Sequence, residues 1–309
     1  MKLYKPKFWS KKYSLFSILL FPISFVLQIL ISIKNRLMTA RNFNIPVICV
    51  GNIYIGGTGK TPLSIMIAEE LLNQQKKPSI IKKYYSKHKD EHDLINQKVN
   101  CLFLAKNRYL AIKDAEKSKC DVAILDDGFQ DYSIKKDISI LCFNERQLIG
   151  NGMTLPSGPL RENISGIKRA DIVIINGDRN ILFEKKIHNI SKNIDIYYSK
   201  YVPVNINKFK NKKLFAFAGI GNPENFFDLL VKNNLNLKKK ISFPDHHHFN
   251  KKELQVIVNE SLKKNLELIT TEKDYIRIKN MGIKNIGYLE LKLEITKKNN
   301  LIKKINDYL

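Results

Sequence analysis

GGTGKT, at residues 56–61, is the most informative stretch of this 309-residue sequence. A short β-branched apolar run at residues 46–50 (PVICV) precedes it and predicts a buried strand. Residues 62–73 follow it and carry apolar side chains at helical spacing. Between a strand and a helix, glycines let the backbone wrap around a phosphate, and the helix N-terminus supplies N–H donors. The stretch therefore predicts a phosphate-binding loop.

The residues expected to hold the phosphates of a nucleotide are Gly56, Gly57, Thr58, Gly59, Lys60 and Thr61. In such a loop the lysine reaches the β- and γ-phosphates, and the threonine hydroxyl binds Mg²⁺. The strict pattern GxxxxGK[ST] is not met, because Tyr54 stands where that pattern requires glycine. The alternative interpretation is a glycine-rich turn that happens to precede Lys-Thr.

A pair of acids adds a metal site to this prediction. Residues 122–125 (VAIL) are typical of another buried strand, and Asp126 and Asp127 follow directly. A phosphate-binding loop needs an acid at the end of a neighbouring strand to hold the metal. We therefore predict Thr61, Asp126 and Asp127 as ligands in an Mg²⁺-nucleotide site. The alternative is that the two acids lie in a solvated loop.

Other continuous apolar runs predict strands that are buried on both faces, at residues 138–143, 172–175, 214–218, 266–270 and 286–289. Strands that alternate with helices predict a parallel α/β sheet. We expect a P-loop NTPase-like parallel sheet, then a second, smaller α/β domain after the polar stretch near residue 205. The expected divisions are 1–40 for an N-terminal membrane-associated helix with basic flanks, 41–205 for the P-loop domain and 206–309 for the C-terminal domain.

The composition excludes some classes of protein. Apolar residues make up 44% of the chain, which is enough to build cores and excludes global disorder. Lys and Arg number 53 against 29 Asp and Glu, so the formal charge of +24 favours an anionic partner. The four cysteines have no CxxC spacing, which indicates reduced thiols in place of a disulfide framework or a zinc site.

The N-terminal region has the composition of a membrane-associated helix. Residues 13–33 carry no charge, and basic residues flank them on both sides. A helix of this length measures about 31 Å, just enough to cross the hydrocarbon core. All the polar residues of this helix lie within an arc of about 80° around its axis: Ser14, Ser17, Ser24, Gln28 and Ser32. This stripe favours a helix that lies in the membrane interface. A spanning helix is the alternative, and a signal peptide is disfavoured because no small-residue cleavage site follows.

Beyond the loop, the chain resembles the tetraacyldisaccharide 4′-kinases of lipid A synthesis. The motifs that carry the resemblance are residues 126–130 (DDGFQ), 155–162 (LPSGPLRE), 218–224 (AGIGNPE), 243–247 (FPDHH) and 270–274 (TTEKD). The resemblance implies transfer of the ATP γ-phosphate, with Mg²⁺, to the 4′-hydroxyl of a lipid A disaccharide 1-phosphate precursor. It places the enzyme at the cytoplasmic face of the bacterial inner membrane, held by a monotopic or single N-terminal helix anchor. An anionic membrane surface is then a partner, and neither nucleic acid nor an obligate protein partner is inferred.

The resemblance also implies roles for single residues. Asp90 matches the family's catalytic base, and His246, or its neighbour His247, matches the histidine coupled to that base. Arg161 is expected, with Lys60, to act on the transferring or substrate phosphate. Substrate-side roles fall to Tyr85, Gln130 and Glu162, and the C-terminal domain is expected to contribute to the active-site cleft. This chain departs from the family at residues 82–86, where KKYYS replaces Ser-Arg-Gly-Tyr-Gly.

Three other interpretations remain open from the sequence. A membrane-tethered regulatory P-loop NTPase would share the loop and the anchor, and differs in having a protein partner and slow hydrolysis. A nucleic-acid-binding protein is suggested only by the charge, because no nucleic-acid module is recognised. The consecutive histidines at residues 246–248 could form part of a metal site, although three in a row cannot all face one ion.

Overall fold

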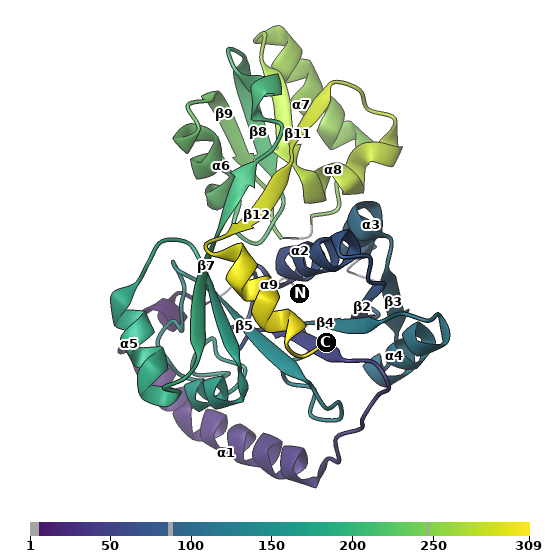
Figure 1. The fold of residues 1–309 in the computed structure, drawn as a ribbon. Helices are drawn as coiled ribbons and strands as arrows, with labels where there is room; N and C mark the ends of the chain where they lie inside the picture. Colours follow the sequence, from purple (N-terminus) through teal and green to yellow (C-terminus); the bar gives the residue numbers. More distant parts are fainter. Residues whose placement is uncertain (1–5, 86–88, 246) are drawn as a thin grey trace. The chain divides into compact units, whose positions relative to one another are not determined.

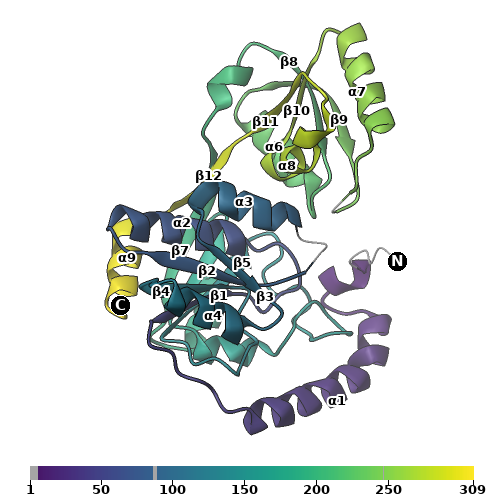
Figure 2. The same cartoon turned by 90° about the vertical axis from the view of Figure 1, so that its right-hand side faces the viewer.

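The structure is a computed structural model that describes residues 6–85, 89–245 and 247–309, with the backbone alone at residues 89 and 90. The chain forms two compact units. The first unit comprises Met1–Tyr85, Val99–Lys200 and Glu294–Leu309. The second comprises Ser86–Lys98 and Tyr201–Leu293. Each unit is built on its own sheet (Figures 1 and 2).

An eight-stranded sheet forms the centre of the first unit, in the order β12-β7-β6-β5-β1-β4-β2-β3. Its strands are β1 (Val47–Gly51), β2 (Pro78–Lys83), β3 (Leu102–Ala105), β4 (Val122–Asp126), β5 (Ile138–Asn144), β6 (Ile172–Asn176), β7 (Asp195–Pro203) and β12 (Leu291–Ile295). From β3 to β7 the neighbouring strands are parallel. Because β1 lies between β4 and β5, the carboxyl ends of three strands meet beside the loop that follows β1.

Helices cover this sheet and extend from it. They are α1 (Leu15–Leu37), α2 (Lys60–Asn73), α4 (Arg108–Lys117), α5 (Ile181–Ile190) and α9 (Lys298–Asn306), with short 3₁₀ turns η1 (Lys7–Ser10) and η3 (Ile164–Arg169). Figures 1 and 2 show α1 as a long helix at the periphery of the unit. The C-terminal helix α9 belongs here because Lys298 pairs with Glu70 of α2 at 2.8 Å, and Lys304 pairs with Asp195 of β7.

The second unit has a four-stranded parallel sheet in the order β11-β10-β8-β9. Its elements are α3 (Lys89–Val99), η4 (Ile206–Phe209), β8 (Lys213–Ala218), α6 (Pro223–Lys232), β9 (Asn236–Ser242), α7 (Lys251–Lys263), β10 (Glu267–Thr271), α8 (Glu272–Ile278), η5 (Lys279–Met281) and β11 (Ile286–Leu289). Helix α3 is tied to this unit by charge, since Lys98 lies 2.8 Å from Glu272 and 2.7 Å from Glu290.

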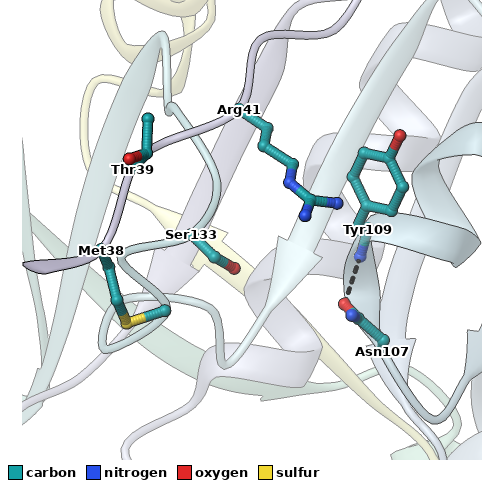
Figure 3. Close-up of a pocket in the computed structure, with 6 residues that line it drawn as sticks. All are labelled: Met38, Thr39, Arg41, Asn107, Tyr109 and Ser133. Atoms are coloured by element: carbon teal, nitrogen blue, oxygen red, sulfur yellow. Dashed lines mark hydrogen bonds between the residues drawn. The ribbon is translucent and has the colours of Figure 1, made fainter. Parts of the chain in front are cut away.

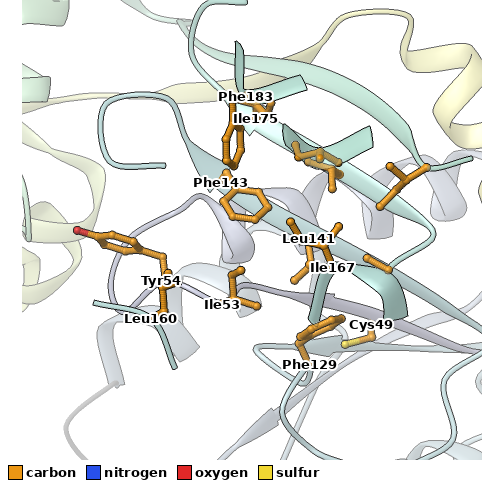
Figure 4. Close-up of a cluster of buried hydrophobic side chains, with 14 residues drawn as sticks. Cys49, Ile53, Tyr54, Phe129, Leu141, Phe143, Leu160, Ile167, Ile175 and Phe183 are labelled. Carbon is orange, nitrogen blue, oxygen red and sulfur yellow. The ribbon is translucent and has the colours of Figure 1, made fainter. Parts of the chain in front are cut away.

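The core of the first unit explains why its strands are continuous apolar runs. Strands β1, β5 and β6 are covered on both faces, so nearly all their side chains are buried. One cluster packs Cys49, Phe129 and Phe143 with η3 and α5 (Figure 4). Gly51 is required there, because a β-carbon at this position would lie 2.4 Å from that of Phe129. The end of β1 is therefore held firmly against the residues that follow Asp127.

The α/β class with a large parallel sheet and an apolar N-terminal helix is confirmed. The division into 41–205 and 206–309 stays a prediction, and the compact units differ from it at residues 86–98, 201–205 and 294–309. Residues 86–98 group with the second unit, where Lys98 of α3 pairs with Glu272, and residues 294–309 group with the first, where Lys298 of α9 pairs with Glu70. Local sequence patterns do not predict contacts between residues that are so far apart along the chain.

Candidate active site

The loop after β1 has the backbone of a phosphate cradle. Gly56 and Gly59 have φ of 121° and 93°, which side-chain-bearing residues rarely adopt, and Gly59 caps the N-terminus of α2. Asn52 is buried beneath the loop, where its amide donates to the Gly56 carbonyl at 3.2 Å and to the Thr58 hydroxyl at 2.9 Å. The loop is thus held in shape from below, and α2 begins at Lys60 with free N–H groups at its first turn.

Thr61 and Asp126 meet at the first turn of α2. The Thr61 hydroxyl donates to Asp126 Oδ2 at 2.8 Å, and Asp126 is completely buried at the end of β4. Lys82, at the end of β2, places its Nζ 2.6 Å from the same carboxylate oxygen. The other oxygen, Asp126 Oδ1, is buried and has no hydrogen-bond partner. A hydroxyl and a carboxylate, both hard oxygen donors, therefore converge at the point where the sequence predicts Mg²⁺.

Asp127 points to a different set of partners. Its Oδ1 accepts from Arg161 at 2.7 Å and lies 3.6 Å from Lys60 Nζ. Burial alone would raise the pKa of Asp127, but Lys60, Arg161 and Arg108 outweigh it and hold the pKa below the ordinary value of 3.8. Asp127 also has φ of 63°, unusual for a non-glycine residue, while its N–H donates to Val50 at 2.9 Å. The carboxylate is therefore ionised and held between basic groups beside the loop.

A polar chain leads from this carboxylate to the 3₁₀ turn η3. Arg161 Nη1 also donates to Gln130 at 3.3 Å, and the Gln130 amide donates to Glu162 and to the Asn52 carbonyl, each at 2.8 Å. Glu162 in turn pairs with Arg169, whose guanidinium lies 4.2 Å from the centroid of the Phe129 ring. Gln130 and Glu162 thus act as supports that orient Arg161 and the base of the loop.

The segment that carries Arg161 is paired with the residues that lead into the phosphate loop. Leu160 forms an antiparallel bridge with Tyr54, the Ile55 N–H donates to Pro159 at 2.9 Å, and the Arg161 N–H donates to Ile53 at 2.7 Å. Backbone hydrogen bonds therefore hold residues 53–55 and 159–161 side by side. Tyr54, which breaks the strict loop pattern, is buried in this pairing.

The polar stripe of α1 docks on the same segment. Ser17 and Ser24 are buried, although the apolar side chains around them are exposed. Ser24 Oγ donates to the Thr154 carbonyl at 3.0 Å, lies 2.8 Å from Ser157 Oγ, and accepts from the Ser157 N–H at 3.0 Å. Asn151 donates to Ser17 at 3.1 Å. The apolar face of α1 remains open, with exposed fractions of 65% at Phe16 and 57% at Leu30.

Three of the predicted site residues have no described side chain in this cluster. Tyr85 is half exposed at the end of the first unit, with Lys83 Nζ 5.6 Å from its ring centroid. Asp90 lies in the first turn of α3, but its side chain is outside the described residues. His246 lies outside them altogether. His247 is described, and it bonds to Glu253 at 2.8 Å and stacks on Phe243.

A separate pocket lies where α1 ends, and none of the predicted site residues lines it (Figure 3). Its lining residues are Met38, Thr39, Arg41, Asn107, Tyr109 and Ser133.

In the described part of the chain, no group of three or more His, Cys, Asp or Glu side chains gathers to hold a metal ion. A cation site here therefore depends on the Thr61–Asp126 pair together with oxygens of a bound nucleotide.

Sequence reasoning missed several members of the cluster. Lys82 was noted only as a departure from a family motif, and Asn52, Arg108 and Arg169 were given no role. A register argument could have found Lys82: Ile81 of β2 lies opposite Leu125 of β4, so Lys82 is beside Asp126. Arg108, by contrast, reaches the Asp127 carbonyl at 2.7 Å from the start of α4, a contact with no local signal.

The chain is similar to known proteins along nearly its whole length. Residues 16–309 match the family described as Tetraacyldisaccharide-1-P 4'-kinase. The chain is 43% identical over 309 residues to the tetraacyldisaccharide 4'-kinase of Pelagibacter ubique (strain HTCC1062), which spans 99% of this chain and 98% of that relative. The proteins of the same name from Francisella tularensis subsp. novicida (strain U112) and Rickettsia bellii (strain OSU 85-389) are each 33% identical, spanning 94% and 99% of this chain and 98% of each relative.

A solved structure supports the fold. The chain resembles a crystal structure of LpxK from Aquifex aeolicus in complex with ATP, with a TM-score of 0.73 and 23% identity. The likeness covers 94% of this chain and 99% of that chain. At this identity the likeness shows a shared fold, that is, the same arrangement of helices and strands within each unit.

Proposed function

Because this chain belongs to the Tetraacyldisaccharide-1-P 4'-kinase family, we propose that it transfers the γ-phosphoryl group of ATP to the 4′-hydroxyl of a tetraacylated glucosamine disaccharide 1-phosphate in lipid A synthesis. In this reaction the 4′-oxygen forms a bond to phosphorus, the bond to the ADP oxygen breaks, and the hydroxyl proton leaves. The observation that carries the proposal is the phosphate cradle at residues 56–61 beside the buried Asp126 and the half-buried Asp127.

The loop and the start of α2 support ATP binding. Backbone N–H groups at the N-terminus of α2 and the positive φ of Gly56 and Gly59 suit close approach of phosphate oxygens. Lys60 lies beside Asp127 in this structure, and its ammonium is placed to neutralise charge on the β- and γ-phosphates. Phosphoryl transfer depends mainly on positioning and on such charge neutralisation.

The oxygen atoms of Thr61 and Asp126 make the site suitable for a magnesium ion. The Thr61 hydroxyl and the Asp126 carboxylate converge, and Asp126 Oδ1 is a buried oxygen with no partner. These two residues would hold the ion, and Asp127, which pairs with Lys60 and Arg161, would be a further oxygen ligand. When bound, the ion neutralises charge on the phosphate oxygens.

The proton of the 4′-hydroxyl requires a base. The resemblance assigns it to Asp90, with His246 coupled to it. A carboxylate with a neighbouring imidazole can accept the proton and pass it to solvent. This assignment rests on the motifs alone, because neither side chain is among those that the structure describes.

Arg161 is placed to act on phosphate. Its Nη1 contacts Asp127 and Gln130 in the cluster beside Lys60, and its side chain is 27% exposed, so an anion can reach it. Gln130 and Glu162 would keep it oriented through the 2.8 Å bond between them. Tyr85 offers an exposed ring on the acceptor side.

The acceptor is a lipid, and α1 supports work at a membrane surface. This helix is long and apolar enough to cross a membrane. Ser17 and Ser24 of its polar stripe are buried against residues 151–157, however, while its apolar face is exposed, which favours a monotopic helix half-embedded in the interface. Basic residues on both flanks and a net charge of +24 suit an anionic leaflet at the cytoplasmic face of the inner membrane. No nucleic acid or obligate protein partner is part of the proposal.

The direct test incubates the protein with ATP, Mg²⁺ and detergent-dispersed disaccharide 1-phosphate, and follows ³²P transfer to the lipid. We expect labelled bisphosphorylated lipid and stoichiometric ADP. ADP formation that is independent of the lipid, with no labelled lipid, would instead indicate a membrane-tethered regulatory NTPase. The matched control is the same lipid lacking a free 4′-hydroxyl, which should accept no phosphate.

A further inference from the structure

Lys82 is a buried cation at the point where the divalent ion is expected. It lies at the end of β2, with 10% of its side chain exposed against none for Asp126. Its Nζ lies 2.6 Å from Asp126 Oδ2 and 3.4 Å from the Thr61 hydroxyl oxygen. A lysine is seldom buried to this degree, because removing an ammonium from water is costly unless it is paired. Its place beside Thr61 and Asp126, two of the three predicted magnesium ligands, therefore needs a reason.

The neighbouring acids are divided between different basic groups. Asp126 pairs with Lys82, whereas Asp127 pairs with Arg161 and lies 3.6 Å from Lys60. The loop lysine is therefore not the group that neutralises Asp126 in this structure. An ammonium that contacts both Thr61 and Asp126 is close enough to repel any second cation bound by the same two side chains.

We propose that Lys82 is a built-in counter-ion that competes with Mg²⁺ for Asp126, so that the divalent ion enters only together with ATP. Without nucleotide, the ammonium satisfies the buried carboxylate and disfavours binding of a free ion. ATP brings several negative charges to the loop, which outweigh the repulsion between the two cations. The inference rests on the proposed magnesium site and makes Lys82 a positioning residue for that site.

Manganese binding to the nucleotide-free protein tests this without turnover. Mn²⁺ is titrated against the wild type, Lys82→Met and Lys82→Arg, and free Mn²⁺ is measured by electron paramagnetic resonance. Lys82→Met, which keeps the length and removes the charge, should lower the Kd for Mn²⁺ at least tenfold. Lys82→Arg keeps the charge and should bind as weakly as the wild type. The matched control is Lys83→Met at the next position of β2, which should leave the Kd unchanged.

A second variant locates the effect. In Lys82→Met/Asp126→Asn the gain in Mn²⁺ affinity should disappear, because the carboxylate that Lys82 occupied is neutral. With saturating ATP, the wild type and Lys82→Met should bind Mn²⁺ with Kd values within about threefold of each other. An unchanged Kd in nucleotide-free Lys82→Met, or a gain that persists in the double variant, would overturn the proposal.

Thermal unfolding gives an independent readout. Lys82→Met leaves a buried carboxylate without its cation, so its Tm should fall, and added Mn²⁺ should restore much of it while leaving the wild type unaffected. If Lys82→Met does not fold, Lys82→Gln serves the same comparison. None of these measurements uses the lipid, so a failed kinase assay with intact metal competition would refute the proposed function alone.

Discussion

The residues beside the phosphate-binding loop have separable roles, because Asp126 and Asp127 have different basic partners. Asp126 is fully buried and bonded to Thr61 and Lys82, while the half-buried Asp127 faces Lys60 and Arg161. Substitutions in the cluster should therefore differ in their effects on metal affinity, on turnover and on stability. Three predictions belong to this scale.

Replacing Lys60 tests the phosphate role of the loop. Lys60→Ala removes the ammonium beside Asp127, and we expect kcat to fall at least about 10²-fold because charge on the transferring phosphate is no longer neutralised. The fold should be intact, as judged by circular dichroism. Lys117→Ala, at a lysine that is 80% exposed, is the control. Near-normal kinase activity in Lys60→Ala would rule out the loop assignment.

Replacing Asp90 tests the base. Asp90→Ala should lower kcat by about 10²–10⁴, the usual contribution of a general base, with little change in the KM for ATP. Asp93→Ala, one turn further along α3, is the control and should keep full activity. The measurement is lipid phosphorylation at saturating ATP across pH 6–9. If Asp90→Ala keeps the wild-type rate, the proton acceptor lies elsewhere.

The ion pair of Arg161 with Asp127 should make stability depend on pH. The pKa of Asp127 is held below its ordinary value of 3.8, so the pair stabilises the fold above that pH and its contribution is lost as pH falls through the lowered value. Arg161→Gln should lower the free energy of unfolding by about 1 kcal/mol at pH 7. The cost should shrink toward zero in acid, as measured by urea unfolding between pH 2.5 and 7.

A double-mutant cycle is the control for this pH dependence. In an Asp127→Asn background the carboxyl group cannot titrate, so the effect of Arg161→Gln should no longer vary with pH. A cost that is equally pH-dependent in both backgrounds would assign the titration to another group.

At the scale of elements, helix α1 and the segment that carries Arg161 form one assembly. Serines of α1 bond to residues 151–157, and residues 159–161 pair with residues 53–55, which lead into the phosphate loop. Helix α1 is thereby connected through hydrogen bonds to the residues that precede the loop at 56–61. The sequence showed the serine stripe, and the structure shows the surface that this stripe contacts.

Removing one hydroxyl should weaken this assembly. Ser24→Val leaves the Ser157 N–H and the Thr154 carbonyl without their partner, at a cost of about 1–3 kcal/mol. We expect faster proteolytic cleavage between residues 148 and 160 and a lower kcat. Ser32→Val, at the exposed end of the same helix, should change neither. Equal behaviour of the two variants would show that the buried contact is not important for the loop.

At the scale of the whole molecule, charge and apolar surface combine to favour a membrane. The chain carries +24, and the exposed face of α1 presents apolar side chains, among them Leu19 at 64% and Leu30 at 57% exposure. Electrostatic attraction is screened by salt, whereas burial of apolar surface is not. The two contributions can therefore be separated in solution.

Vesicle binding measures both contributions. The protein should co-sediment with vesicles that contain anionic lipid, and about 0.5 M NaCl should weaken binding severalfold without abolishing it. Leu19→Asp/Leu30→Asp should abolish the salt-resistant part. Leu182→Asp, at an 81% exposed leucine of α5, is the control and should bind as the wild type does. Salt-resistant binding by the double variant would exclude α1 as the apolar anchor.

Local patterns determined much about this protein by themselves. Glycines between an apolar strand and a helix can only be accommodated as a tight loop, so β1, the loop and α2 were predictable, as was the strand that ends in Asp126. Continuous apolar runs identified β5, β6, β8, β10 and β11. The Lys-rich strand β9 was missed, because its exposed positions alternate with half-buried ones and its lysines obscure the pattern.

Tertiary structure alone decided which groups meet. Lys82 is 44 residues from Asp126, and Ser24 is 133 from Ser157, so neither contact leaves a local signal. Strand order and register set the first, and the docking of α1 on a distant loop sets the second. Periodicity and backbone preference act over a few neighbouring residues, whereas the partner of a buried charge depends on which segments pack together, and packing is a property of the folded chain.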